Sequence, residues 1–146
     1  MRLQTSTKLA IYAAIELAAD AGRQQSVSAM GEKFGVSSHH LAKVMNELAH
    51  AGLVQAVRGV GGGYQFSANP RRTTLYNVIR LFEEIGGEER EPEATPESLA
   101  LGDVLHEIDD IAIATLGSIT IATMCKSAQA RRTNGAAPRP NERTSV

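Results

Sequence analysis

Residues 35–66 read GVSSHHLAKVMNELAHAGLVQAVRGVGGGYQF, and this stretch decides the fold. A Gly-Val-Ser turn precedes residues 38–51, whose apolar residues recur at steps of three and four and so predict a helix with one apolar face. Two strand-like runs follow at 53–58 and 63–68, with a glycine-rich segment between them. Glycine supplies the positive φ angles that a tight hairpin turn requires. The stretch therefore predicts a helix followed directly by a β-hairpin.

Two further helices are predicted in front of this stretch. The first starts near Thr5 or Ser6 and runs to about Asp20, and it is apolar on most faces, so we expect it to be largely buried. A shorter helix follows, with a serine as its N-cap, and stops at Gly35. Two short helices joined by a tight turn form a helix-turn-helix, and a hairpin directly after it is a wing.

The face of the third predicted helix opposite its apolar stripe is polar and contains no acidic residue. Hydrogen-bonding and basic side chains occupy this face and its N-terminal turn: Ser37, Ser38, His39, Lys43, Asn46 and His50. A recognition helix in a major groove needs such side chains at its exposed N-terminal end, together with cations for phosphates. An ordinary solvated amphipathic helix remains the alternative interpretation of this helix taken alone.

The glycine cluster has three possible explanations: a nucleotide phosphate, a turn between strands, or a DNA groove. The segment GVGGGY lacks the third glycine of the dinucleotide fingerprint, the chain has no GKS or GKT, and no strand–glycine–helix order is present. A wing can enter a minor groove where a bulky side chain would clash. We therefore expect the glycines to let the backbone approach DNA. The predicted wing contacts are Arg58, Gly59, Gly61, Gly62, Gly63 and Tyr64.

The charge is unevenly divided along the 146 residues, although the formal net charge is only −1. Residues 1–76 carry eight Lys or Arg against four Asp or Glu, whereas residues 77–146 carry seven against twelve. A basic front half favours a polyanionic partner such as double-stranded DNA, but a split this modest supports it only weakly. The alternative is ordinary variation of surface charge.

Composition sets the broad class of the protein. A hydrophobic content of 42% and a charged content of 21% are typical of a globular domain. The single cysteine, Cys125, excludes an intrachain disulfide and fits a reducing, cytoplasmic setting. Glu16 interrupts the apolar stretch near the N-terminus, which argues against a secretory signal. No run approaches the roughly 20 apolar residues needed to span a bilayer, so we expect no membrane partner.

The second half predicts a long helix that pairs with a second copy. After a helix over 73–85, residues 86–98 have the composition of a flexible acidic loop. The helix beyond carries an apolar stripe longer than the core of a winged helix needs: Leu101, Val104, Leu105, Ile108, Ile111, Ala112 and Leu116. A two-fold partner would bury it. We expect a mainly α fold with a small β-hairpin, divided into a winged helix-turn-helix domain at 1–85, the loop at 86–98, a dimerisation helix and a short terminal helix at 99–128, and a disordered tail at 129–146.

The stretches MRLQTSTKLAIYAA (1–14), 35–66, TLYNVIRLFEEI (74–85) and LGDVLHEIDD (101–110) resemble the Rrf-two family of bacterial winged-helix regulators. The resemblance spans about residues 1–124, and V-R-G-x-G-G-G after AGLV is its most specific part. Ser37, His40 and Lys43 fit a GVS-x-x-H-x-x-K pattern similar to that of the nitric-oxide-sensing repressors. The resemblance implies a homodimeric repressor on a partly palindromic operator. It places Ser37–Lys43 in the major groove and the wing Arg58–Gly63 in the minor groove.

One departure from the family concerns its cofactor. Members that sense nitric oxide, iron or cluster status carry three cysteines in the loop before the long helix, and this chain has none there. Lys8 stands where some relatives carry a carboxylate ligand. We therefore expect no iron–sulfur cluster and no metal site. A regulator that uses Cys125 as a redox switch, or His106 and Glu107 as non-cysteine ligands, remains open. A winged helix that binds protein is another alternative.

An enzyme has little support in the sequence. The four histidines show no spacing typical of zinc ligands, and no Ser/His/Asp or Cys/His arrangement stands out. We therefore expect a DNA-binding protein rather than a catalyst.

Overall fold

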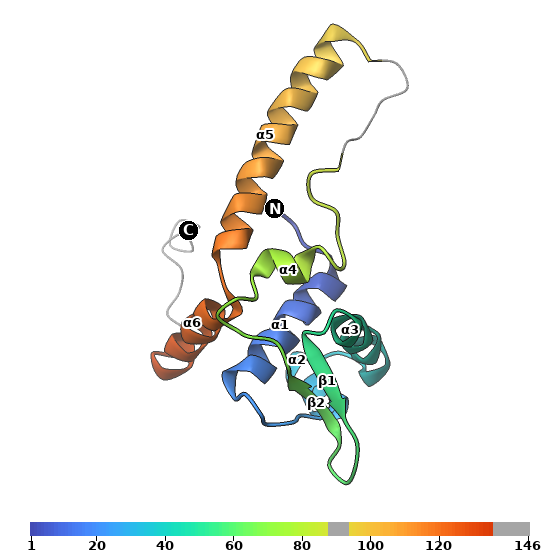
Figure 1. Cartoon of the computed structure of the whole chain (residues 1–146), viewed down its shortest axis with the longest axis vertical. Helices are drawn as coiled ribbons and strands as arrows, with labels where there is room; N and C mark the ends of the chain where they lie inside the picture. Colours follow the sequence, from blue (N-terminus) through green and yellow to red (C-terminus); the bar gives the residue numbers. More distant parts are fainter. Residues whose placement is uncertain (88–93, 136–146) are drawn as a thin grey trace, which may run out of the picture.

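The computed structural model describes residues 1–87 and 94–135 of the chain (Figure 1). The fold is mainly helical with one antiparallel two-stranded hairpin, as the sequence predicted. In chain order the elements are α1 (Thr5–Ala19), α2 (Val27–Phe34), α3 (Ser38–His50), β1 (Val54–Val57), β2 (Gly63–Phe66), α4 (Leu75–Ile79), α5 (Pro96–Ser118) and α6 (Ile121–Thr133).

The core lies around α1. This helix runs through the middle of the compact part of the molecule, with α3 and the hairpin on one side and α6 on the other (Figure 1). The apolar stripe predicted for α3 is fully buried against it. Large side chains from six elements fill the interior: Leu17, Met30, Leu41, Met45, Leu48, Val54, Val78, Ile79 and Ile121. Because burying one such side chain contributes about 1.5–3 kcal/mol, this core holds the hairpin and α3 in a fixed relation.

The turn between α2 and α3 is built as the sequence indicated. Gly35 ends α2 with a φ of 68°, in the left-handed region that favours glycine. The Ser37 hydroxyl accepts a hydrogen bond from the backbone N–H of His40 and thereby caps α3. The Ser26 hydroxyl caps α2 in the same way, through Ala29. α1 differs, since it begins at Thr5 after Gln4, which makes no side-chain cap. The Gln4 backbone N–H instead donates to Glu83 at 2.6 Å.

The helix expected over 73–85 is much shorter. α4 covers only Leu75–Ile79, although a capping box between Thr74 and Asn77 starts it firmly. The next residues continue as turns, with the N–H groups of Leu81 and Phe82 bonded three residues back. Apolar spacing alone does not distinguish such a chain of turns from a continuous helix.

α5 is a long helix that projects away from the compact unit (Figure 1), and none of its residues is fully buried. It begins at Pro96, with Thr95 and Ser98 forming a capping box, so residues 96–98 are helical rather than part of the expected acidic loop. Residues 88–93 of that loop lie outside the described residues.

α6 returns to pack against α1. It extends to Thr133, so residues 129–133, which we expected in a disordered tail, form its last turn. Residues 136–146 of that segment lie outside the described residues. No helix within residues 1–87 and 94–135 combines the length and apolar character that crossing a membrane requires.

Candidate nucleic-acid interface

α3 presents a polar face to solvent. His39, Lys43, Asn46 and His50 are all exposed, and Ser38 is exposed at the first turn. The opposite, apolar face of α3 is buried in the core, so the helix cannot rotate about its axis without breaking those core contacts. Donors and acceptors therefore lie at the exposed N-terminal end of a rigid helix, which is the arrangement that base edges and phosphates require.

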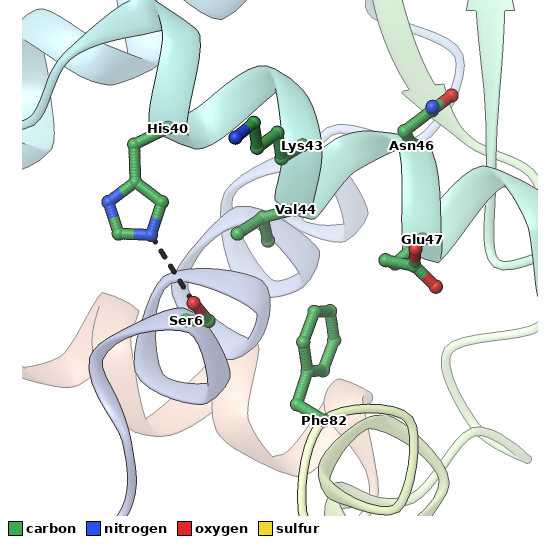
Figure 2. Close-up of a pocket in the computed structure, with 7 residues that line it drawn as sticks. All are labelled: Ser6, His40, Lys43, Val44, Asn46, Glu47 and Phe82. Carbon is green, nitrogen blue, oxygen red and sulfur yellow. Dashed lines mark hydrogen bonds between the residues drawn. The ribbon is translucent and has the colours of Figure 1, made fainter.

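His40 does not lie with His39. Its side chain is half-buried and turns toward α1, where its Nε2 atom lies 3.3 Å from the Ser6 hydroxyl (Figure 2). No local pattern predicts this contact, because it joins residues 34 positions apart. The pair links the N-terminal turns of α1 and α3, so Ser6 is a site-lining residue that the sequence analysis missed.

An open hollow of about 500 Å³ runs along this side of α3 (Figure 2). Its lining combines a cation and an acid from α3 with an apolar floor: Ser6, His40, Lys43, Val44, Asn46, Glu47 and Phe82. Phe82 comes from the turns after α4 and points toward Val44. Glu47 lies beside the polar face, so the surface of α3 is less uniformly favourable to phosphate than the sequence suggested.

The hairpin forms a wing in the expected register. Val54 pairs with Phe66 and Val57 with Gly63, which leaves residues 58–62 as the connecting turn. Arg58 is exposed at the base of this turn, and Val60 is fully exposed at its tip. α3 and β1 pack against each other, so the polar face of α3 and the wing belong to one rigid surface.

Each of the four clustered glycines has a cause within the chain. Gly59 and Gly61 have φ angles of 124° and 76°, which favour glycine, and space around them is open. A Cβ on Gly62 would lie 2.7 Å from the Val57 carbonyl oxygen, and one on Gly63 would collide with the Gln25 carbonyl. The cluster is therefore needed for the hairpin itself, and close approach to DNA stays a prediction. Tyr64 lies in β2 rather than at the tip and is half-buried.

Cys125 lies on the other side of α1 from the wing. It is half-buried, and its thiol donates to the backbone carbonyl of Ile15 at 3.5 Å. Burial raises the pKa of this thiol, although the nearby Arg132 guanidinium partly opposes the rise. A thiol that resists ionisation is a poor metal ligand and a slow nucleophile. The structure thus gives Cys125 the character of a packing residue.

The described residues do not fit an iron–sulfur cluster. Within residues 1–87 and 94–135, no group of three or more His, Cys, Asp or Glu side chains comes together to hold a metal. His106 lies on exposed α5 and faces Asp110 at 3.6 Å, and Glu107 is also exposed. Lys8 is exposed on α1. No step of the function is therefore assigned to a cluster.

Comparison with known proteins identifies the family. Residues 3–127 match Rrf2, described as "Iron-dependent Transcriptional regulator". The chain belongs to the Rrf2 family. It is 46% identical over 128 residues to the putative HTH-type transcriptional regulator BadM of Rhodopseudomonas palustris, a match that covers 86% of this chain and 82% of that protein.

Solved Rrf2-like structures share the fold. CymR (YrzC), the global cysteine regulator of B. subtilis, superposes with a TM-score of 0.75 at 26% identity, over 87% of this chain and 98% of that one. T. potens IscR superposes with a TM-score of 0.68 at 26% identity, over 95% and 94%. The Rrf2 protein described here is thus a DNA-binding transcriptional regulator and not an enzyme, which confirms the family and the function class predicted from the sequence.

Proposed function

We propose that this Rrf2 protein is a homodimeric repressor that binds a partly palindromic operator without an iron–sulfur cluster. The observation that carries the proposal is the single rigid surface formed by the exposed polar face of α3 and the adjoining wing with Arg58. α3 would read base edges in the major groove through Ser37, Ser38, His39 and Lys43. Arg58 would enter the neighbouring minor groove, whose negative potential attracts arginine.

The proposal of a dimer rests on α5. Five side chains on one face of this helix are more than half exposed: Leu101, Val104, Leu105, Ile108 and Ile111. Ala112 and Leu116, which the sequence placed in the same stripe, are half-buried, and Leu116 packs against the core of its own chain. Large contiguous apolar surfaces are rarely left exposed on a monomer, and a second copy would cover this one. A two-fold dimer presents two recognition helices, which accounts for a partly palindromic operator.

Binding without a cluster is supported by the cysteine content and by the site of Cys125. The sequence contains one cysteine, Cys125, and its side chain is half-buried between α6 and α1. A cluster needs about four ligands, and a dimer would supply only two such thiols on surfaces remote from the wing. We therefore expect metal-free protein to bind its operator fully.

Selection of bound genomic fragments, followed by gel shifts with the enriched sequence, tests the proposal. Arg58→Ala should weaken specific binding by about 1–3 kcal/mol. Lys43→Ala should weaken binding too, and it should reduce the slope of log affinity against log salt concentration by about one. Arg131→Ala is the matched control, because Arg131 is exposed on α6, on the other side of α1.

The outcome separates the proposal from its alternatives. Loss of affinity in the first two variants, with Arg131→Ala unchanged and chelator without effect, supports metal-free DNA recognition. Absence of any enriched DNA would refute it and favour a winged helix that binds protein. Binding that requires reconstituted iron and sulfide would refute the metal-free part alone.

A further inference from the structure

The segment between α1 and α2 is joined to the wing by a single antiparallel bridge between Gln25 and Tyr64. The Gln25 backbone N–H donates to the Tyr64 carbonyl at 2.9 Å, and the Tyr64 N–H donates back to Gln25, also at 2.9 Å. Gly63 lacks the Cβ that would collide with the Gln25 carbonyl, so this pairing depends on glycine at that position. The Gln25 amide also reaches Glu16 of α1 at 3.4 Å. The base of the wing is thus fixed to α1.

The preceding residue reaches further along the hairpin. The side-chain amide of Gln24 donates to the carbonyl oxygen of Gly61 at 2.9 Å, which ties the connecting turn to a residue 37 positions earlier. Within the turn itself, the Gly62 N–H donates to the Gly59 carbonyl oxygen at 2.9 Å. Glycines give a turn wide conformational freedom, so a contact from outside the hairpin restricts it substantially.

We propose that Gln24 is a positioning residue for Arg58. By holding the Gly61 carbonyl, Gln24 orders the turn so that the Arg58 side chain can insert into DNA. The inference rests on the proposed function. Arg58 is the first residue of the connecting turn that the register leaves at 58–62. A turn that is held in one conformation also holds the backbone from which the Arg58 side chain extends. Without Gln24, the turn would have to be ordered when DNA binds, and that entropic cost would appear as lower affinity.

A double-mutant cycle on the operator distinguishes positioning from direct contact. Gln24→Ala should weaken wild-type binding about three- to tenfold, the range set by one neutral hydrogen bond. In the Arg58→Ala background the same change should have almost no effect, because there is no arginine left to position. Gln55→Ala is the matched control, since Gln55 is an exposed glutamine of β1 in the same hairpin.

Relaxation of the backbone ¹⁵N nuclei in the free protein tests the ordering without DNA. Order parameters at Gly61 and Gly62 should fall from about 0.85 toward 0.6 in Gln24→Ala, with the core and the melting temperature unchanged. Equal losses from Gln24→Ala in both backgrounds, or unchanged order parameters, would overturn the inference while leaving the proposed function intact. A wild-type protein that binds no DNA would overturn the proposed function itself.

Discussion

The exposed apolar stripe of α5 predicts that substitutions within it will dissociate the proposed dimer. Replacing both Ile108 and Ile111 with Glu should convert the proposed dimer into monomers, because these side chains lie in the middle of the stripe and are 55% and 61% exposed. The helix itself should survive, since Glu has a slightly better helix propensity than Ile and neither side chain is part of the buried core.

The magnitude follows from how much surface each side chain leaves uncovered. The five large residues of the stripe are 52–61% exposed, so covering the remainder contributes about 1 kcal/mol each, roughly half of the 1.5–3 kcal/mol of full burial. Two copies of the stripe therefore contribute about 10 kcal/mol to association. Losing four of those side chains removes about 4 kcal/mol, or about a thousandfold in dissociation constant.

Sedimentation velocity at micromolar concentration measures the change directly. Leu99→Glu is the matched control: Leu99 is 59% exposed on the same helix, but it precedes Ile108 by nine residues and so lies about 180° away. Only the double variant should dissociate, and its operator affinity should fall by the roughly 10²- to 10⁴-fold that linked binding confers. A double variant that remains dimeric, or a wild type that sediments as a monomer, would refute the reasoning.

Three further predictions concern single-residue substitutions or the reactivity of a single residue. Burial acts to raise the pKa of Glu16, but hydrogen bonds from Lys33 and Gln25 and the charges of Lys33 and Arg132 together outweigh it and hold the pKa below its usual value. Glu16→Gln should therefore lower the free energy of unfolding by about 1 kcal/mol at pH 7 and by much less near pH 3, where the carboxylate contribution is lost; equal losses in urea titrations at both pH values would contradict this. Cys125 should react with iodoacetamide more slowly at pH 7.5 when folded than in urea, because burial raises its pKa and restricts access to the thiol, and equal rates would show an accessible thiolate. Gly63→Ala should destabilise the fold by about 1–3 kcal/mol, whereas Gly102→Ala on open α5 should stabilise it by about 0.4–1 kcal/mol in thermal melts.

Local chemistry made the recognition helix and the wing predictable from sequence. The serine cap of α2, its end at Gly35 and the apolar stripe of α3 each act within a few residues, and all three appear in the structure as expected. The same kind of local cue was available at Thr95–Pro96, where a capping threonine precedes proline at the first helical position. The acidic, proline-containing composition around it is typical of a loop and predicts a helix only from residue 99, whereas α5 begins at Pro96.

Contacts between distant residues were not predictable in this way. The Ser6–His40 and Gln24–Gly61 pairs depend on how α1 packs beside α3 and the hairpin, and no periodicity records that packing. The glycine cluster shows the converse problem. Its density suggested an external partner, whereas Gly63 is needed because Gln25, far away in the sequence, lies directly against it.

The junction between the wing domain and α5 determines how a dimer would present its two recognition helices. The Leu75 backbone N–H donates to the Ile119 carbonyl at 2.9 Å, and the Ile121 N–H donates to the Thr73 carbonyl at 2.8 Å. These bonds flank a bridge between Thr74 and Thr120, so the C-terminal end of α5 is fixed to the segment that follows the wing. α5 therefore cannot swivel freely relative to α3 near that end. If two α5 helices pair as proposed, the separation of the two α3 helices is set by this junction, and the operator half-sites should have one preferred spacing rather than a range.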